Sequence, residues 1–196
     1  MEKAKGISTP MATSTKLDKD EDGKPVDEAV YRGMVGSLLY LTNSRSDIMQ
    51  SVCLCARFQA NPKESHFIAV KRILRYLIDT EKLYLFYLMF DNFDLKGYSD
   101  ADYGGCSEKD YGVDFACVPI YCDNSSTIAI SKNFAPHSRT KHIDIRHHFL
   151  RDHVEKVNIK LVFCPTEDQK ADIFTKPLAR ERFEKLRLEI GLINGD

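Results

Sequence analysis

The amino-acid sequence predicts an α+β chain, in which a helical part is followed by a mixed α/β sheet with flanking helices. Two observations predict this order. Apolar residues recur at helical spacing through residues 27–80, a pattern typical of amphipathic helices. Over residues 83–196, short apolar segments alternate with helical segments, as in chains that build a sheet covered by helices.

Residues 1–26 are predicted to form a flexible N-terminal segment. They are rich in Lys, Asp, Ser and Thr, they contain Pro10 and Pro25, and residues 18–23 lack apolar periodicity. Such a composition disfavours a packed core. We therefore expect neither a helix nor a strand here, although the segment could lie extended on another surface.

Three helices are predicted within residues 27–80. The third has the clearest start signal, with Asn61 as N-cap, Pro62 at the first helical position and Glu64 three residues after the cap. The predicted apolar faces are Ala29, Val30, Met34, Leu38 and Leu41 in the first helix, Ile48, Val52, Cys55 and Phe58 in the second, and Phe67, Val70, Ile73, Leu74 and Leu77 in the third.

The remaining elements are shorter. Residues 83–90 and 93–99 are predicted to form two strands joined by a turn at Asp91 and Asn92. A capping box at Thr166 and Gln169 is predicted to open a short helix around Asp172. The other predicted elements are strands at 115–122 and 159–164 and helices at 125–132, 139–157 and 180–192.

Composition excludes several classes of protein. No apolar run reaches the ~18 residues of a membrane span, and the N-terminus lacks the apolar stretch of a signal peptide. The six cysteines show no Cys-x-x-Cys pair and no zinc-site spacing. We therefore expect an intracellular protein, cytoplasmic or nuclear, with no membrane partner and no disulfide framework.

Charge is unevenly distributed along a chain of net charge −1. Residues 91–114 hold seven acids against two lysines, whereas residues 137–160 hold six Lys or Arg against three acids, with five histidines. This arrangement suits a metal site beside a face that contacts a phosphate backbone, and chance patchiness is the alternative. The candidate backbone contacts are Arg139, Lys141, Arg146 and Arg151.

Three carboxylates are candidates for a metal site. Asp100 and Asp123 each follow a predicted strand, and Asp172 lies on a predicted short helix. Clustered carboxylates can hold two divalent ions ~4 Å apart, one activating water and one stabilising the leaving oxygen, and oxygen ligands suit Mg²⁺. Aspartates after strands are also common turn formers, so the pattern alone leaves both interpretations open.

Several motifs, in order and over nearly the whole chain, resemble the copia-type (Ty1/copia) retrotransposon Pol polyproteins. Examples are Gly97-Tyr98-Ser99-Asp100-Ala101-Asp102, Cys122-Asp123-Asn124 and Ala171-Asp172-Ile173-Phe174-Thr175-Lys176. Further matching stretches are residues 31–42, 45–48, 69–77 and 137–148.

The resemblance implies two parts. Residues 27–90 would be the C-terminal, thumb- or connection-like helices of a reverse transcriptase, and residues 91–196 an RNase H-like domain. The family's RNase H carboxylates carry over to Asp100, Asp123 and Asp172, with Mg²⁺ as cofactor and an RNA–DNA hybrid as partner. The polymerase carboxylates lie upstream of the matched region, so some apolar surface of the helices is expected to be exposed or repacked.

The resemblance also implies an internal deletion. Only 22 residues separate Asp100 from Asp123, whereas the family places two strands and a Glu-bearing helix there. The break lies near residues 107–110, and Glu108 is not expected to replace the missing glutamate. We therefore expect vestigial carboxylates and lost RNase H activity. The alternatives are a non-catalytic nucleic-acid-binding module and a genomic relic without function.

Overall fold

A computed structural model describes residues 6–87, 95–99, 118–132 and 159–195. It is mixed helix and sheet, as predicted, and divides into two units. The helical unit consists of Met1–Met89 together with Asp172–Asp196, and the sheet unit consists of Phe90–Ala171. The helical unit is therefore built from both ends of the chain, although the sequence assigned residues 172–196 to the second part.

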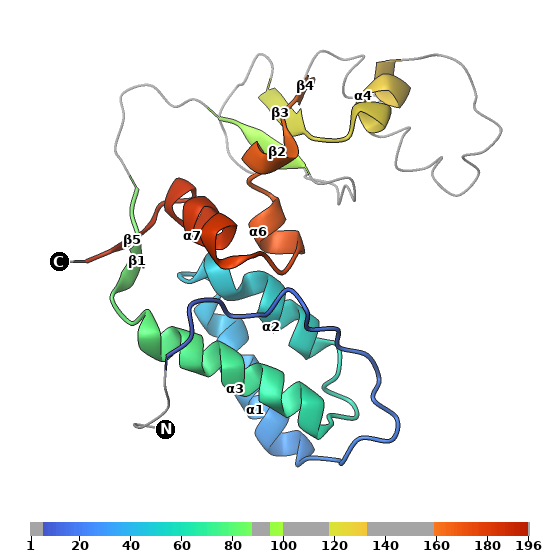
Figure 1. Cartoon of the computed structure of the whole chain (residues 1–196), viewed down its shortest axis with the longest axis vertical. Coiled ribbons are helices and arrows are strands. Elements are labelled where there is room, and N and C mark those ends of the chain that lie inside the picture. Colours follow the sequence, from blue (N-terminus) through green and yellow to red (C-terminus); the bar gives the residue numbers. More distant parts are fainter. Residues whose placement is uncertain (1–5, 88–94, 100–117, 133–158, 196) are drawn as a thin grey trace. The chain divides into compact units, whose positions relative to one another are not determined.

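The three helices predicted within residues 27–80 are confirmed (Figure 1). They are α1 (Glu28–Leu41), α2 (Met49–Ala56), which follows the 3-10 turn η1 (Ser46–Ile48), and α3 (Glu64–Asp79). The C-terminal part of the same unit adds α6 (Asp172–Thr175) and α7 (Arg180–Glu189).

One apolar core joins the two ends of the chain. Side chains from α1, α2 and α3 pack with side chains from α6 and α7 in a single cluster. The Tyr76 ring, on α3, meets the Phe183 ring edge-on with centroids 5.7 Å apart. The most completely buried members of the core include Tyr31, Val35, Ile48, Val52, Ile73, Tyr76, Ile173 and Leu186.

The predicted start of α3 is wrong by two residues. Lys63, not Asn61, is the N-cap, and its backbone N–H donates to Nδ1 of His66 at 2.9 Å. Pro62 instead lies before the helix and accepts a hydrogen bond from Val26 N–H at 3.2 Å. The buried face consists of His66, Ala69, Val70, Ile73 and Tyr76, so it is rotated from the predicted one, whose Phe67, Leu74 and Leu77 are only partly buried.

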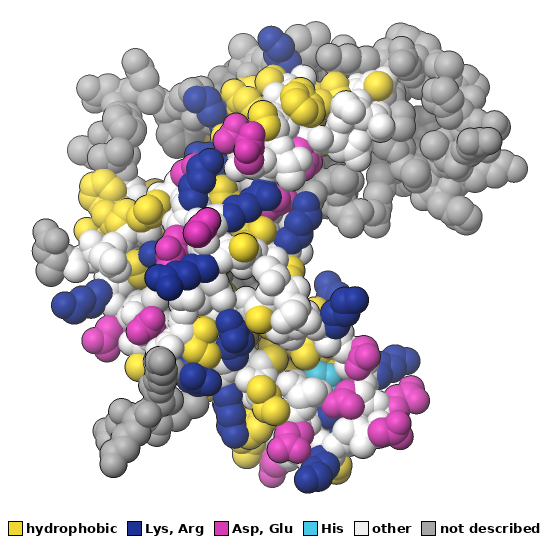
Figure 2. All heavy atoms as spheres, viewed as in Figure 1, with side chains coloured by type: hydrophobic (Ala, Val, Ile, Leu, Met, Phe, Trp, Pro, Cys, Tyr) yellow, Lys and Arg dark blue, Asp and Glu magenta, His cyan; other side chains and the backbone are white. Residues whose placement is uncertain are grey.

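The N-terminal segment 6–26 forms no helix or strand, as predicted, but it is packed on the helices. Met11 is buried in the core, and Nε2 of His66 lies 2.7 Å from the backbone oxygen of Asp18. Ser65 Oγ donates to Asp20 Oδ2. Figure 2 shows acidic side chains gathered on one part of the surface of the helical unit. Side-chain contacts therefore order a segment that its own composition leaves without structure.

The predicted hairpin between residues 83–90 and 93–99 is wrong. Strand β1 (Leu83–Leu85) pairs antiparallel with the C-terminal strand β5 (Leu192–Asn194), with Leu83 opposite Asn194. The last helix, predicted over residues 180–192, ends at Glu189 because residues 192–194 form β5. Gly191 has a φ of 88°, the left-handed conformation that ends helices and favours glycine. The chain can then turn into β5.

Among its described residues, the sheet unit contains three parallel strands in the order β2-β3-β4. These are β2 (Gly97–Ser99), β3 (Val118–Cys122) and β4 (Ile159–Phe163). Helix α4 (Ser125–Lys132) has the predicted bounds and begins after Asn124, whose Oδ1 accepts from Ser126 and Thr127 N–H at 3.0 and 3.2 Å. The predicted helix 139–157 and the turn at residues 91–92 lie outside the described residues.

Some apolar surface of the helices is exposed, as expected. Val30 and Tyr40 on α1 are 52% and 82% exposed, and Ile68 on α3 is 61% exposed. Gly33 and Gly36, both on α1, also face open space. Within the part of the chain that the structure describes, no helix is both long and apolar enough to cross a membrane.

The cysteines of α2 are expected to react very differently. Cys53 is exposed and Cys55 is buried, both as free thiols, and burial raises the pKa of Cys55 from 9.0 to about 12. Since the thiolate is the nucleophile, this shift lowers its population near pH 8 by about 1000-fold. Iodoacetamide should therefore label Cys53 in the folded chain and Cys55 only after denaturation, as read by tandem mass spectrometry. A Cys53→Ser chain labelled natively at Cys55 would contradict the burial.

Candidate functional site

The ends of β2 and β3 lie side by side. Ser99 and Cys122, the last residues of the two strands, are register partners in a parallel pair. Asp123 follows directly and is half-buried. Asp100, the residue after β2, lies outside the described residues. The structure thus places Asp123 at the carboxyl edge of the sheet, as the sequence predicted.

Gln169 was expected to complete a capping box, and it does something else. Its side chain is fully buried, and Nε2 donates to the backbone oxygen of Ser99 at 2.9 Å. Its Oε1 accepts from Ala171 N–H at 3.3 Å. Gln169 therefore fastens the loop after β4 to the end of β2. A buried Gln between charged residues gave no sequence signal for this role.

Asp172 belongs to the helical unit rather than to the sheet unit. It is the first residue of α6, and its side chain is 1% exposed. Lys176 Nζ donates to Oδ1 at 3.0 Å, and Arg182 Nη2 donates to Oδ2 at 2.6 Å. Both carboxylate oxygens are therefore held by cationic side chains.

The other predicted site residues cannot be placed. Arg139, Lys141, Arg146 and Arg151 lie outside the described residues, as does Glu108. Among the residues that are described, no group of three or more His, Cys, Asp or Glu side chains could hold a metal ion.

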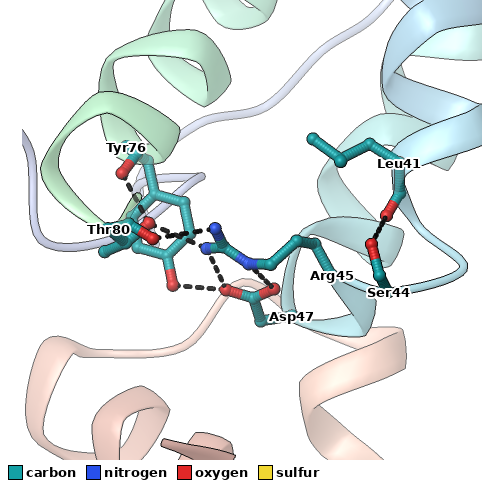
Figure 3. Close-up of polar contacts among 6 residues, drawn as sticks. All are labelled: Leu41, Ser44, Arg45, Asp47, Tyr76 and Thr80. Atoms are coloured by element: carbon teal, nitrogen blue, oxygen red, sulfur yellow. Dashed lines mark hydrogen bonds and ion pairs between the residues drawn. The ribbon is translucent and has the colours of Figure 1, made fainter. Parts of the chain in front are cut away.

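A buried polar network lies in the helical unit (Figure 3). Arg45 pairs with Asp47 through two hydrogen bonds, from Nε to Oδ1 at 3.0 Å and from Nη2 to Oδ2 at 2.8 Å. Tyr76 Oη also donates to Asp47 Oδ2. Arg45 Nη1 and Nη2 reach the backbone oxygen and Oγ1 of Thr80 at 3.0 and 2.8 Å. The network ties the turn after α1 to the C-terminal end of α3.

The environment keeps Arg45 charged. Burial alone would lower the pKa of Arg45, but the hydrogen bonds and negative charge of Asp47 outweigh it, so the pKa lies above its usual value. Burial, followed by the Asp47 charge, raises the pKa of Tyr76. Residues 45–48 are one of the stretches that carry the family resemblance, and here their role is structural.

Comparisons with curated proteins find three relatives along almost the whole chain. Two are named retrovirus-related Pol polyproteins from transposons RE1 and RE2 of Arabidopsis thaliana, 33% and 32% identical over 96% and 97% of this chain. The third is that from transposon TNT 1-94 of Nicotiana tabacum, 32% identical over 98%. The chain spans only 17% to 19% of their lengths. No model of a protein family and no solved structure matches.

The alignments are longer than the chain itself. The match to the RE1 protein extends over 243 positions but takes in 96% of 196 residues, which is about 188. About 55 of the 243 aligned positions therefore have no residue in this chain. In the match to the TNT 1-94 protein, about 60 of the 252 aligned positions likewise have no residue in this chain. The relatives thus contain sequence that is absent here.

Proposed function

Because this chain belongs to the retrovirus-related Pol polyproteins of copia-type retrotransposons, we propose that it is a remnant of one that has lost its activity. The proposed ancestral reaction is Mg²⁺-dependent cleavage of RNA in RNA–DNA hybrids. In this proposal residues 27–90 derive from the end of a reverse transcriptase and residues 91–196 from an RNase H domain.

The observation that supports the loss is the missing sequence. About 55 positions of the RE1 protein have no counterpart here, from 243 aligned positions and about 188 aligned residues. Only 22 residues separate Asp100 from Asp123, where the family resemblance predicts two strands and a Glu-bearing helix. We propose that the absent positions fall in this gap. Loss of one ligand from a two-metal site misplaces the attacking water.

The donor chemistry of the remaining carboxylates is uneven. Asp123 offers a half-buried carboxylate at the sheet edge, which suits an oxygen-preferring ion such as Mg²⁺. Asp172 does not fit in the same way, because Lys176 and Arg182 occupy both of its oxygens. When bound, the metal would supply an activated water. Among the described residues, the chain's own contribution is to hold Asp123 after β3.

We expect no cleavage when the purified chain is incubated with a labelled RNA–DNA hybrid and Mg²⁺ or Mn²⁺. The product should stay at the level of the protein-free control, while an intact RNase H cleaves the same hybrid. The matched variants are Asp123→Asn at the proposed site and Asp22→Asn in the N-terminal segment. Cleavage that disappears in Asp123→Asn and persists in Asp22→Asn would show that the site is active.

A second candidate function is a non-catalytic nucleic-acid-binding module. It is favoured by the six Lys or Arg residues within residues 137–160, among them Arg139, Lys141, Arg146 and Arg151. Binding through phosphate contacts weakens steeply with salt. Anisotropy titration of a labelled hybrid at several salt concentrations tests this candidate, and no binding at low salt would remove it.

A further inference from the structure

We infer that Asp172 is a structural residue of the helical unit, whose carboxylate locks α6 to α7, and that it does not ligate a metal ion. The family resemblance assigns this position to the last metal-binding carboxylate, and the structure gives it different neighbours. The inference rests on the proposed function only for that assignment.

The first step is the geometry of the ion pairs. Asp172 and Lys176 are four residues apart, so their pair spans α6 and the residue that follows it. Arg182 comes from α7 and lies 2.6 Å from the other oxygen. One carboxylate therefore holds two segments together, and short contacts to charged donors are among the stronger hydrogen bonds in proteins.

The second step is burial. The Asp172 side chain is 1% exposed, and the next residue, Ile173, lies in the apolar core with Phe183 and Leu186. A buried carboxylate must be compensated by charge and hydrogen bonds. Lys176 and Arg182 supply both, although Lys176 itself is 46% exposed and contributes less because water screens it.

The third step is the mismatch with Mg²⁺. This ion requires oxygen ligands in octahedral geometry and usually keeps several waters. The two groups beside Asp172 are cationic nitrogen donors, which repel a divalent cation and cannot ligate it. A hydrated ion would have to displace both ion pairs.

The test compares thermal unfolding of the full chain by circular dichroism, with EDTA and with millimolar MgCl₂. Asp172→Asn keeps the shape of the side chain and removes its charge. In EDTA we expect its Tm to fall by roughly 10 °C, because a buried charge pair is broken. The matched control, Glu181→Gln on the exposed face of α7, should shift Tm by less than ~2 °C. MgCl₂ should not change the difference between the native chain and Asp172→Asn.

Equal Tm values for the native chain and Asp172→Asn in EDTA would overturn the inference. The inference would also be overturned if MgCl₂ raised the Tm of the native chain but not that of Asp172→Asn. Lys176→Gln covers the case in which Asp172→Asn does not fold. A structural Asp172 predicts a smaller loss of Tm in Lys176→Gln and no response to MgCl₂, whereas a metal ligand predicts stronger stabilisation by MgCl₂ once the competing cation is gone.

These outcomes are separate from those of the cleavage experiment. A chain that cleaves hybrids through Asp123 would refute the proposed loss of activity, and the Tm of Asp172→Asn would still report on the ion pair. An inactive chain that MgCl₂ stabilises through Asp172 would refute the inference and leave the proposed function standing.

Discussion

A chain that stops after Ala171 is expected to lose the cooperative fold of the helical unit. The stop removes α6, α7 and β5 and, with them, four buried apolar side chains and the buried Asp172. Truncating a single buried apolar side chain to alanine lowers the free energy of unfolding by ~2–5 kcal/mol. The whole free energy of unfolding of a domain is only ~5–15 kcal/mol. The four side chains are Ile173, Phe183, Leu186 and Leu192.

The measurement is thermal unfolding by circular dichroism, with the dispersion of methyl NMR signals as a second readout. We expect a broad, non-cooperative transition for the truncated chain. Two point variants on α7 give a graded version of the same experiment. Leu186→Ala removes a fully buried side chain and should lower the free energy of unfolding by ~2–5 kcal/mol. Leu188→Ala removes one that is 55% exposed and should change it by under ~1 kcal/mol.

A cooperative transition in the chain that stops after Ala171, at the Tm of the full chain, would mean that α1, α2 and α3 fold without the C-terminal segment. That is the outcome expected from the sequence-based division at residues 90 and 91. The experiment therefore separates that division from the two units of the structure.

Asp47→Ala is expected to have the next largest effect, a loss of ~3–5 kcal/mol, because it leaves a buried guanidinium without its counter-ion. Arg45 and Asp47 are both buried and joined by two hydrogen bonds. Tyr76 Oη also loses its acceptor. The measurement is urea unfolding at neutral pH.

Two further variants apportion this effect. Tyr76→Phe removes one hydrogen bond to a charged acceptor and should cost ~1.5–3 kcal/mol. Glu81→Gln changes an exposed carboxylate and should cost under ~0.5 kcal/mol. An Asp47→Ala chain as stable as Glu81→Gln would show that the network contributes nothing to the fold.

Local sequence signals predicted the helices well. The apolar spacing in residues 27–80 identified α1, α2 and α3, and residues 125–132 were predicted with the bounds of α4. These elements depend on contacts between near neighbours, which the 3.6-residue period records. The start of α3 was missed because its N-cap is Lys63, whose backbone N–H donates to the side chain of His66 three residues later. Glu or Gln usually takes the position of His66 in such a capping box.

Pairings between distant residues were not predictable in the same way. Strand β1 was assigned to its neighbour in sequence, whereas its partner β5 lies at the other end of the chain. No local pattern records such a partner, although Gly191 could have signalled the end of α7. The same limit applies to Asp172, since the motif around it identifies a family but not the two cations that hold it.

The pairing of β1 with β5 sets the order of events during synthesis. Leu83 pairs with Asn194, so β1 cannot pair until residues 192–194 have left the ribosome. At ~5–20 residues per second, the apolar face that α6 and α7 later cover stays open for seconds. Closing so long a loop also slows folding. Nascent chains of this protein should therefore depend on chaperones more than the helical content of the helical unit suggests.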